Sequence, residues 1–249
     1  MSGGNMYEWV GYTWNPLAGE CPHRCEYCYV QELKRRFPQL REKYTGPIRI
    51  DEKALNQRLP KNRTIFVCSM NDLFADTIPI DYIYEILTVA GIECGQWEER
   101  IDRIFLFQTK NPRRMKDFLP YFPPHSILGT TIESNKELVK TEAPPPIERY
   151  KAMRELREII DTDIDYKEEV YALKLMVNIE PILDFDLDVM VRWMEDIRPD
   201  FISIGADSKH KNLPEPSSQK VKILIQELEG ISEVRIKKNL KRIVREVIS

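Results

Sequence analysis

Short apolar runs alternate along the chain with longer stretches in which apolar residues recur at helical spacing. The runs are rich in β-branched and aromatic residues and lack the strict alternation of a half-exposed strand, which is typical of strands buried on both faces of a parallel sheet. Six runs are predicted to be strands, at residues 8–14, 64–69, 104–109, 126–131, 172–178 and 201–205. Residues 234–236 are a candidate for a short seventh strand.

Three stretches carry a helical stripe of apolar residues. One begins at Asp81, a plausible N-cap, and another runs from Leu187 to Ile197 and ends before Arg198-Pro199. The third predicts an amphipathic helix at the end of the chain, over residues 237–248. Strand and helix in repetition predict right-handed βαβ units.

This order predicts an α/β fold in a single domain over residues 1–249. Six parallel strands, each followed by a helix, favour a partial, open (β/α)6 TIM-like barrel, because eight units would be needed to close it. A doubly wound open sheet is the alternative. The proline-rich stretch T-E-A-P-P-P introduces an elaboration over residues 135–170.

Three of the five cysteines lie in one loop, residues 15–29, directly after the first predicted strand. Cys21, Cys25 and Cys28 follow the spacing C-x3-C-x2-C, and no second cluster follows them. Structural zinc sites normally have four ligands, whereas a [4Fe–4S] cube bound by three cysteines keeps one iron open for a substrate or cofactor. The cluster is favoured, and zinc remains the alternative.

The stretch C-P-H-R-C-E-Y-C resembles the signature of the radical S-adenosylmethionine superfamily. The resemblance implies that the open iron binds the methionine part of S-adenosylmethionine and that Tyr27 lies beside the adenine. It also implies reductive cleavage of this cofactor to a 5′-deoxyadenosyl radical, which abstracts hydrogen from a substrate. The radical chemistry would belong to the cofactor, and the barrel would orient it and exclude water.

The carboxyl ends of the other predicted strands supply further candidates for binding the cofactor. By position, the resemblance assigns Ser69, Asn71 and Asp72 to the methionine amino group, and Lys110 to the methionine carboxylate or a phosphate. It assigns Glu133, Ser134 and Asn135 to the ribose, and the backbone at Gly205 to the adenine. Glu180 is poorly suited to a buried strand unless it points into a site. For Lys110, after the third strand, the alternative is an ordinary lysine in a solvated loop. In chain order the candidates are Ser69, Asn71, Asp72, Lys110, Glu133, Ser134, Asn135, Glu180 and Gly205.

A narrower resemblance is to phage-associated radical S-adenosylmethionine-like proteins of unassigned activity. It rests on Trp14-Asn15-Pro16 before the cysteines, Tyr29 after them, and the stretches S-M-N-D-L-F and T-I-E. The first two cysteines are closer together here than in that group. A looser resemblance is to the spore photoproduct lyase group, which repairs thymine lesions in DNA.

Composition says less about the partners. The formal charge of −3 neither requires nor excludes nucleic acid, and basic residues gather at 31–49 and in the tail. No apolar run approaches the roughly 20 residues that span a bilayer, and the first residues lack a secretory signal, so we expect a cytoplasmic protein without a membrane partner.

The leading interpretation is a radical enzyme that acts on a large substrate, with nucleic acid as a candidate, and receives electrons from a protein such as flavodoxin or ferredoxin. The alternatives are a peptide- or protein-modifying enzyme of the same superfamily, a non-catalytic iron–sulfur electron-transfer or binding protein, and a zinc-stabilised nucleic-acid binder.

Overall fold

Seven parallel strands form one sheet in the computed structural model, which describes residues 6–94, 102–163, 172–209 and 211–244. The sheet order is β1-β4-β5-β6-β7-β8-β9, the order of these strands in the chain, and every pairing is parallel. A sheet that continues in one direction rolls toward a barrel, whereas a doubly wound sheet reverses its strand order. The strands are β1 (Tyr12–Trp14), β4 (Arg63–Val67), β5 (Arg103–Thr109), β6 (Ile127–Thr131), β7 (Lys174–Ile179), β8 (Phe201–Ile204) and β9 (Glu233–Ile236).

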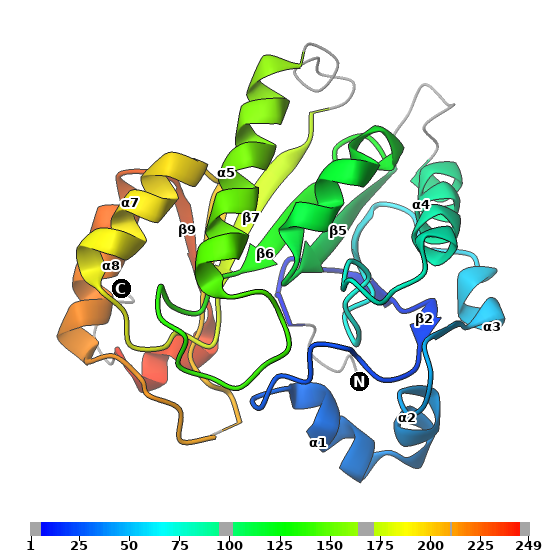
Figure 1. The fold of residues 1–249 in the computed structure, drawn as a ribbon, viewed down its shortest axis with the longest axis horizontal. Coiled ribbons are helices and arrows are strands. Elements are labelled where there is room, and N and C mark those ends of the chain that lie inside the picture. The colour runs from blue at the N-terminus through cyan, green and yellow to red at the C-terminus, as the bar shows by residue number, and fades with distance from the viewer. Residues whose placement is uncertain (1–5, 95–101, 164–171, 210, 245–249) are drawn as a thin grey trace.

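Helices follow one another around the outer face of this sheet (Figure 1). The main core lies between these helices and the outward-facing strand residues, and Phe105, Val177 and Ile202 in it are fully buried. The predicted stripes at residues 81 and 187–197 are confirmed as α4 and α7. The helices that cover the sheet are α4 (Ile80–Cys94), the 3-10 helix η1 (Pro112–Tyr121), α5 (Pro146–Thr162), α7 (Leu187–Ile197) and α8 (Ser218–Glu229).

The inner face of the sheet carries a second, smaller core. Phe66 pairs in register with Leu106, and Met176 with Phe201, so these side chains point to the same side. The residues before β1 close this core, because Tyr7 is only 2% exposed and packs with the same group. The barrel interior is therefore filled at the amino ends of its strands, and polar chemistry is left to the carboxyl ends.

A compact substructure beside the cysteine loop was not predicted. Its elements are too short to carry a periodic signal, and tertiary contacts decide them. Two strands pair in antiparallel fashion, and three short helices surround them. The elements are β2 (Leu17–Ala18), β3 (Arg49–Ile50), α1 (Tyr29–Arg36), α2 (Pro38–Lys43) and α3 (Glu52–Leu55).

Two expected features differ in the structure. The tail has the 3-10 helix η2 (Lys238–Arg242) and a turn where an amphipathic helix over 237–248 was expected, and residues 245–248 lie outside the described residues. In this segment the side-chain amide of Asn239 lies 2.7 Å from the Glu180 carboxylate. This tertiary contact holds the chain in a tighter turn than the expected helix. The expected elaboration contains α5, a regular helix that packs on the sheet, and its residues 164–170 are also outside the described part.

Candidate functional site

The cysteine loop leaves the sheet at the carboxyl end of β1. Trp14 is fully buried, and its indole Nε1 donates to the carbonyl of Ala54 at 2.8 Å. The next residue, Asn15, accepts at its side-chain oxygen from the Ser69 hydroxyl at 3.1 Å and from the Met70 amide at 3.2 Å. The W-N-P stretch therefore ties the start of this loop to the carboxyl end of β4.

All three cysteines of the loop are free and partly exposed. Burial raises the pKa of Cys21 to about 12, and the carboxylate of Asp72 adds to the effect. Burial also raises the pKa of Cys28. Bound positive charge would reverse both effects, because metal coordination deprotonates a thiol outright.

The donor set consists of three thiol side chains in one loop, which is a set that a [4Fe–4S] cube can use. The described residues contain no group of three or more His, Cys, Asp or Glu side chains that converge on one metal ion. In a [4Fe–4S] cube each cysteine binds its own iron, so the three sulfurs of the ligands do not have to converge on one point. Backbone amides already face two of the sulfurs, that of His23 at Cys21 and those of Val30 and Gln31 at Cys28.

His23 ties the cysteine loop to the next two strands. It is 4% exposed, and its Nε2 lies 2.9 Å from Oδ2 of Asp72. Asp72 also accepts from the Thr109 hydroxyl at 2.6 Å and from the Lys110 amide at 2.7 Å. Burial opposes the charge of this carboxylate, but His23 and these donors outweigh it and lower the pKa of Asp72 below its ordinary value.

A buried ionic network lies across the carboxyl ends of β5 and β6. Lys110 Nζ donates to Glu133 and to the Tyr27 hydroxyl, and it lies 4.9 Å from the centre of the Tyr27 ring. Arg149 donates from Nη1 to Glu133 at 2.6 Å and to the carbonyl of Thr131 at 2.9 Å. Burial would raise the pKa of Glu133, but the two adjacent cations hold it at about 2. The site thus holds one carboxylate between two cations beside the cysteine loop.

A second ionic group occupies the carboxyl ends of β7, β8 and β9. Glu180 accepts from Lys237, and from the Asn239 amide at 2.7 Å. Asn239 also donates to the carbonyl of Ala206 at 2.8 Å. A Cβ at Gly205 would lie 2.7 Å from the Glu180 carboxylate, so only glycine leaves room for this arrangement. Glu180 and Gly205, which were predicted as separate candidates, therefore lie next to each other.

The remaining candidates have partners within the protein. Asn71 donates to the carbonyl of Gly19 at 3.0 Å, and Ser134 donates to the carbonyl of Asp184 at 2.6 Å. Asn135 exchanges hydrogen bonds with Asp186. These contacts brace loops around the site. A role for these residues in binding a cofactor stays a prediction, as it does for Ser69 and Asp72.

Sequence reasoning missed several residues of the site. Arg149 reads as an ordinary polar position of α5, although it is 1% exposed. Lys237 and Asn239 fall in a tail that reads as a basic amphipathic helix. In each case the partner is distant in sequence, and only the preceding proline run before α5 marks the region as unusual.

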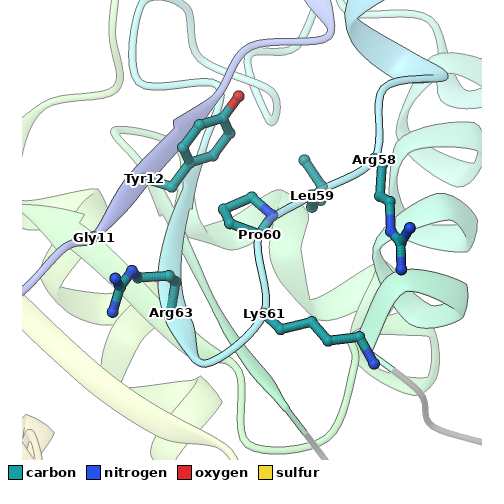
Figure 2. Close-up of a pocket in the computed structure, with 7 residues that line it drawn as sticks. All are labelled: Gly11, Tyr12, Arg58, Leu59, Pro60, Lys61 and Arg63. Atoms are coloured by element: carbon teal, nitrogen blue, oxygen red, sulfur yellow. The ribbon is translucent and has the colours of Figure 1, made fainter.

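Figure 2 shows a surface depression at the opposite end of the sheet, beside the amino ends of β1 and β4. Arg58, Lys61 and Arg63 give it a basic lining, and Lys61 pairs with Asp102 at 3.0 Å. It contains none of the candidate residues. In α/β barrels the chemistry lies at the carboxyl ends of the strands, so this depression is not the candidate active site.

Fold and site together define an open parallel α/β barrel with a three-cysteine loop at its carboxyl edge. Residues 5–208 match the family described as DUF5131, protein of unknown function, and the chain belongs to that family. A search of the curated proteins found no match. No helix within the described residues is long and apolar enough to cross a membrane.

Solved structures with the same fold include spore photoproduct lyase and SuiB. Spore photoproduct lyase complexed with dinucleoside spore photoproduct is 15% identical, with a TM-score of 0.50 over 87% of this chain and 60% of that one. Streptococcus suis SuiB bound to S-adenosylmethionine is 8% identical, with a TM-score of 0.53 over 96% and 53%. SuiB bound to precursor peptide SuiA is 9% identical, with a TM-score of 0.55 over 96% and 51%.

This chain spans about 60% of the length of the spore photoproduct lyase chain. At such identities the likeness shows a shared fold, and with the seven-stranded sheet it confirms the predicted α/β class and partial barrel. No comparison bears on the narrower resemblance to phage-associated proteins, which stays a prediction.

Proposed function

We propose that this protein is a radical S-adenosylmethionine enzyme whose [4Fe–4S] cluster is bound by Cys21, Cys25 and Cys28. The observation that carries the proposal is the position of three free cysteines in the loop after β1, at the carboxyl edge of an open parallel barrel. The shared fold with SuiB, which has been solved with S-adenosylmethionine, supports the same assignment.

When bound and reduced, the cluster would supply the electron that cleaves S-adenosylmethionine to methionine and a 5′-deoxyadenosyl radical. This chain's residues would bind and orient the cofactor. Tyr27 would lie beside the adenine, and Lys110 would meet the methionine carboxylate. Glu133 would accept from the ribose or from the methionine amino group, since it is held ionised by its two cations. Glu180 and Gly205 would line the cofactor site at the carboxyl ends of β7 and β8.

The substrate is proposed to be large, because an open barrel leaves room for a bulky partner to reach the cofactor. The neighbouring structures hold a dinucleoside in spore photoproduct lyase and a precursor peptide in SuiB. Nucleic acid is therefore one candidate and a peptide the other. Electrons would come from a cytoplasmic flavodoxin or ferredoxin. Binding of a labelled oligonucleotide at low salt separates the two candidates, since phosphate contacts weaken steeply with salt.

The enzyme proposal is tested by product analysis. The protein is reconstituted anaerobically with iron and sulfide, reduced, and mixed with S-adenosylmethionine, and 5′-deoxyadenosine is measured by mass spectrometry. Wild-type protein should form the product, and Cys25→Ala should lose both the cluster and the product. Wild-type protein that holds a cluster and yields no 5′-deoxyadenosine would refute the enzyme and favour a non-catalytic iron–sulfur protein.

A further inference from the structure

The cysteine loop is bonded to the segment that follows β6. The Glu26 amide donates to the carbonyl of Lys140 at 3.0 Å, and the Glu142 amide donates to the carbonyl of His23 at 2.7 Å. These two backbone bonds fall on either side of Cys25 in the loop. They fix which residue of the segment meets the Cys25 sulfur.

That residue is Thr141. Its Oγ1 lies 3.2 Å from Sγ of Cys25, and it also donates to the carbonyl of His23 at 2.9 Å and accepts from the Ala143 amide at 3.1 Å. A hydroxyl carries a single proton. While Cys25 is a thiol, its S–H can donate to Thr141. Once Cys25 is an iron-bound thiolate, its sulfur can only accept, so the single proton of Thr141 would turn from the carbonyl of His23 to this sulfur.

The three sulfurs differ in the origin of their donors. Cys21 faces the amide of His23, and Cys28 faces the amides of Val30 and Gln31. These are backbone groups, which a substitution does not delete. The contact at Cys25 comes from a side chain, so a single substitution removes it.

We propose that Thr141 is a positioning residue that sets the reduction potential of the cluster through Cys25. This inference rests on the proposed function. Hydrogen bonds to the sulfurs are one of the factors that set the potentials of iron–sulfur clusters. Reduction adds an electron, and a hydrogen bond to a more negative acceptor is stronger. The Thr141 hydroxyl therefore favours the reduced cluster and makes the electron easier to accept.

The test compares anaerobically reconstituted wild-type protein with Thr141→Val, which keeps the shape and lacks the hydroxyl, and Thr141→Ser, which keeps the hydroxyl. Thr162→Val, on an exposed helix end, is the matched control. Iron and sulfide content and an EPR-monitored redox titration are measured. We expect the equilibrium constant for reduction of the cluster to be about tenfold smaller in Thr141→Val. For one electron, this corresponds to a reduction potential about 59 mV more negative. Thr141→Ser and Thr162→Val should match the wild type.

Each other outcome is decisive. A Thr141→Val protein with a full cluster and an unchanged potential overturns the role of Thr141 while leaving the proposed function intact. Loss of the cluster in Thr141→Val but not in Thr141→Ser overturns the role in the potential, because the hydroxyl would then serve to hold the loop through His23 and Ala143. Loss in both variants overturns the inference, because the residue would then serve only the fold. A wild-type protein without any cluster overturns the proposed function and this inference together.

Discussion

Replacing Glu133 with glutamine should destabilise the protein strongly near neutral pH. The carboxylate is 2% exposed and is paired with Lys110 and with Arg149, which is 1% exposed. The fall of its pKa from 4.5 to about 2 corresponds to about 3 kcal/mol of stability at pH 7. Removing one partner of a buried ion pair costs about 3–5 kcal/mol, which agrees with this value. Glu133→Gln should therefore lower the free energy of unfolding by about 3 kcal/mol.

The pH dependence of this stabilisation follows from the direction of the pKa shift of Glu133. Because the pKa of Glu133 is lower in the folded than in the unfolded protein, its contribution is full well above pH 4.5 and is lost as the pH falls toward 2. Urea unfolding of wild type and Glu133→Gln should thus differ most at pH 7, keep most of this difference at pH 4, and converge only as the pH approaches 2. Glu85→Gln, at an exposed position of α4, is the matched control and should match the wild type throughout. A pH-independent difference, or none at pH 7, would refute the reasoning.

Two further substitutions test the neighbouring contacts. Gly205→Ala should force the Glu180 carboxylate away from Asn239, because the new Cβ would lie 2.7 Å from one and 3.0 Å from the other. The cost should be about 1–3 kcal/mol, read as a fall in Tm, and an unchanged Tm would contradict the close approach. Asp72→Asn should cost about 2 kcal/mol at pH 7 in urea unfolding, because it weakens the link to His23. If Asp72→Asn left the free energy of unfolding unchanged, the contact between Asp72 and His23 would not stabilise the fold.

The strands were predictable because a strand that is buried on both faces of a sheet appears in the sequence as a continuous apolar run. The runs at 104–109, 126–131 and 201–205 lie within about one residue of β5, β6 and β8. The candidate seventh strand is present as β9. The short elements beside the cysteine loop carry no such pattern, because they are held by contacts such as that of Trp14 with Ala54.

Part of the site was predictable from topology. Lys110 and Glu133 follow neighbouring strands of a parallel sheet, so their side chains were expected at one edge, and the structure joins them. The cations that complete the two ionic groups were not predictable. Arg149 and Lys237 reach their partners from a helix and from the end of the chain, and a local pattern does not record which distant carboxylate a cation meets.

The central claim is that three cysteines hold a cluster whose remaining iron is open to S-adenosylmethionine. EPR spectra of the anaerobically reconstituted, reduced protein, recorded with and without S-adenosylmethionine, test it most directly. The account predicts a reduced [4Fe–4S] signal that is absent in Cys25→Ala and whose g values shift when S-adenosylmethionine is added. Bound zinc without acid-labile sulfide, or a cluster signal that S-adenosylmethionine leaves unchanged, would contradict it.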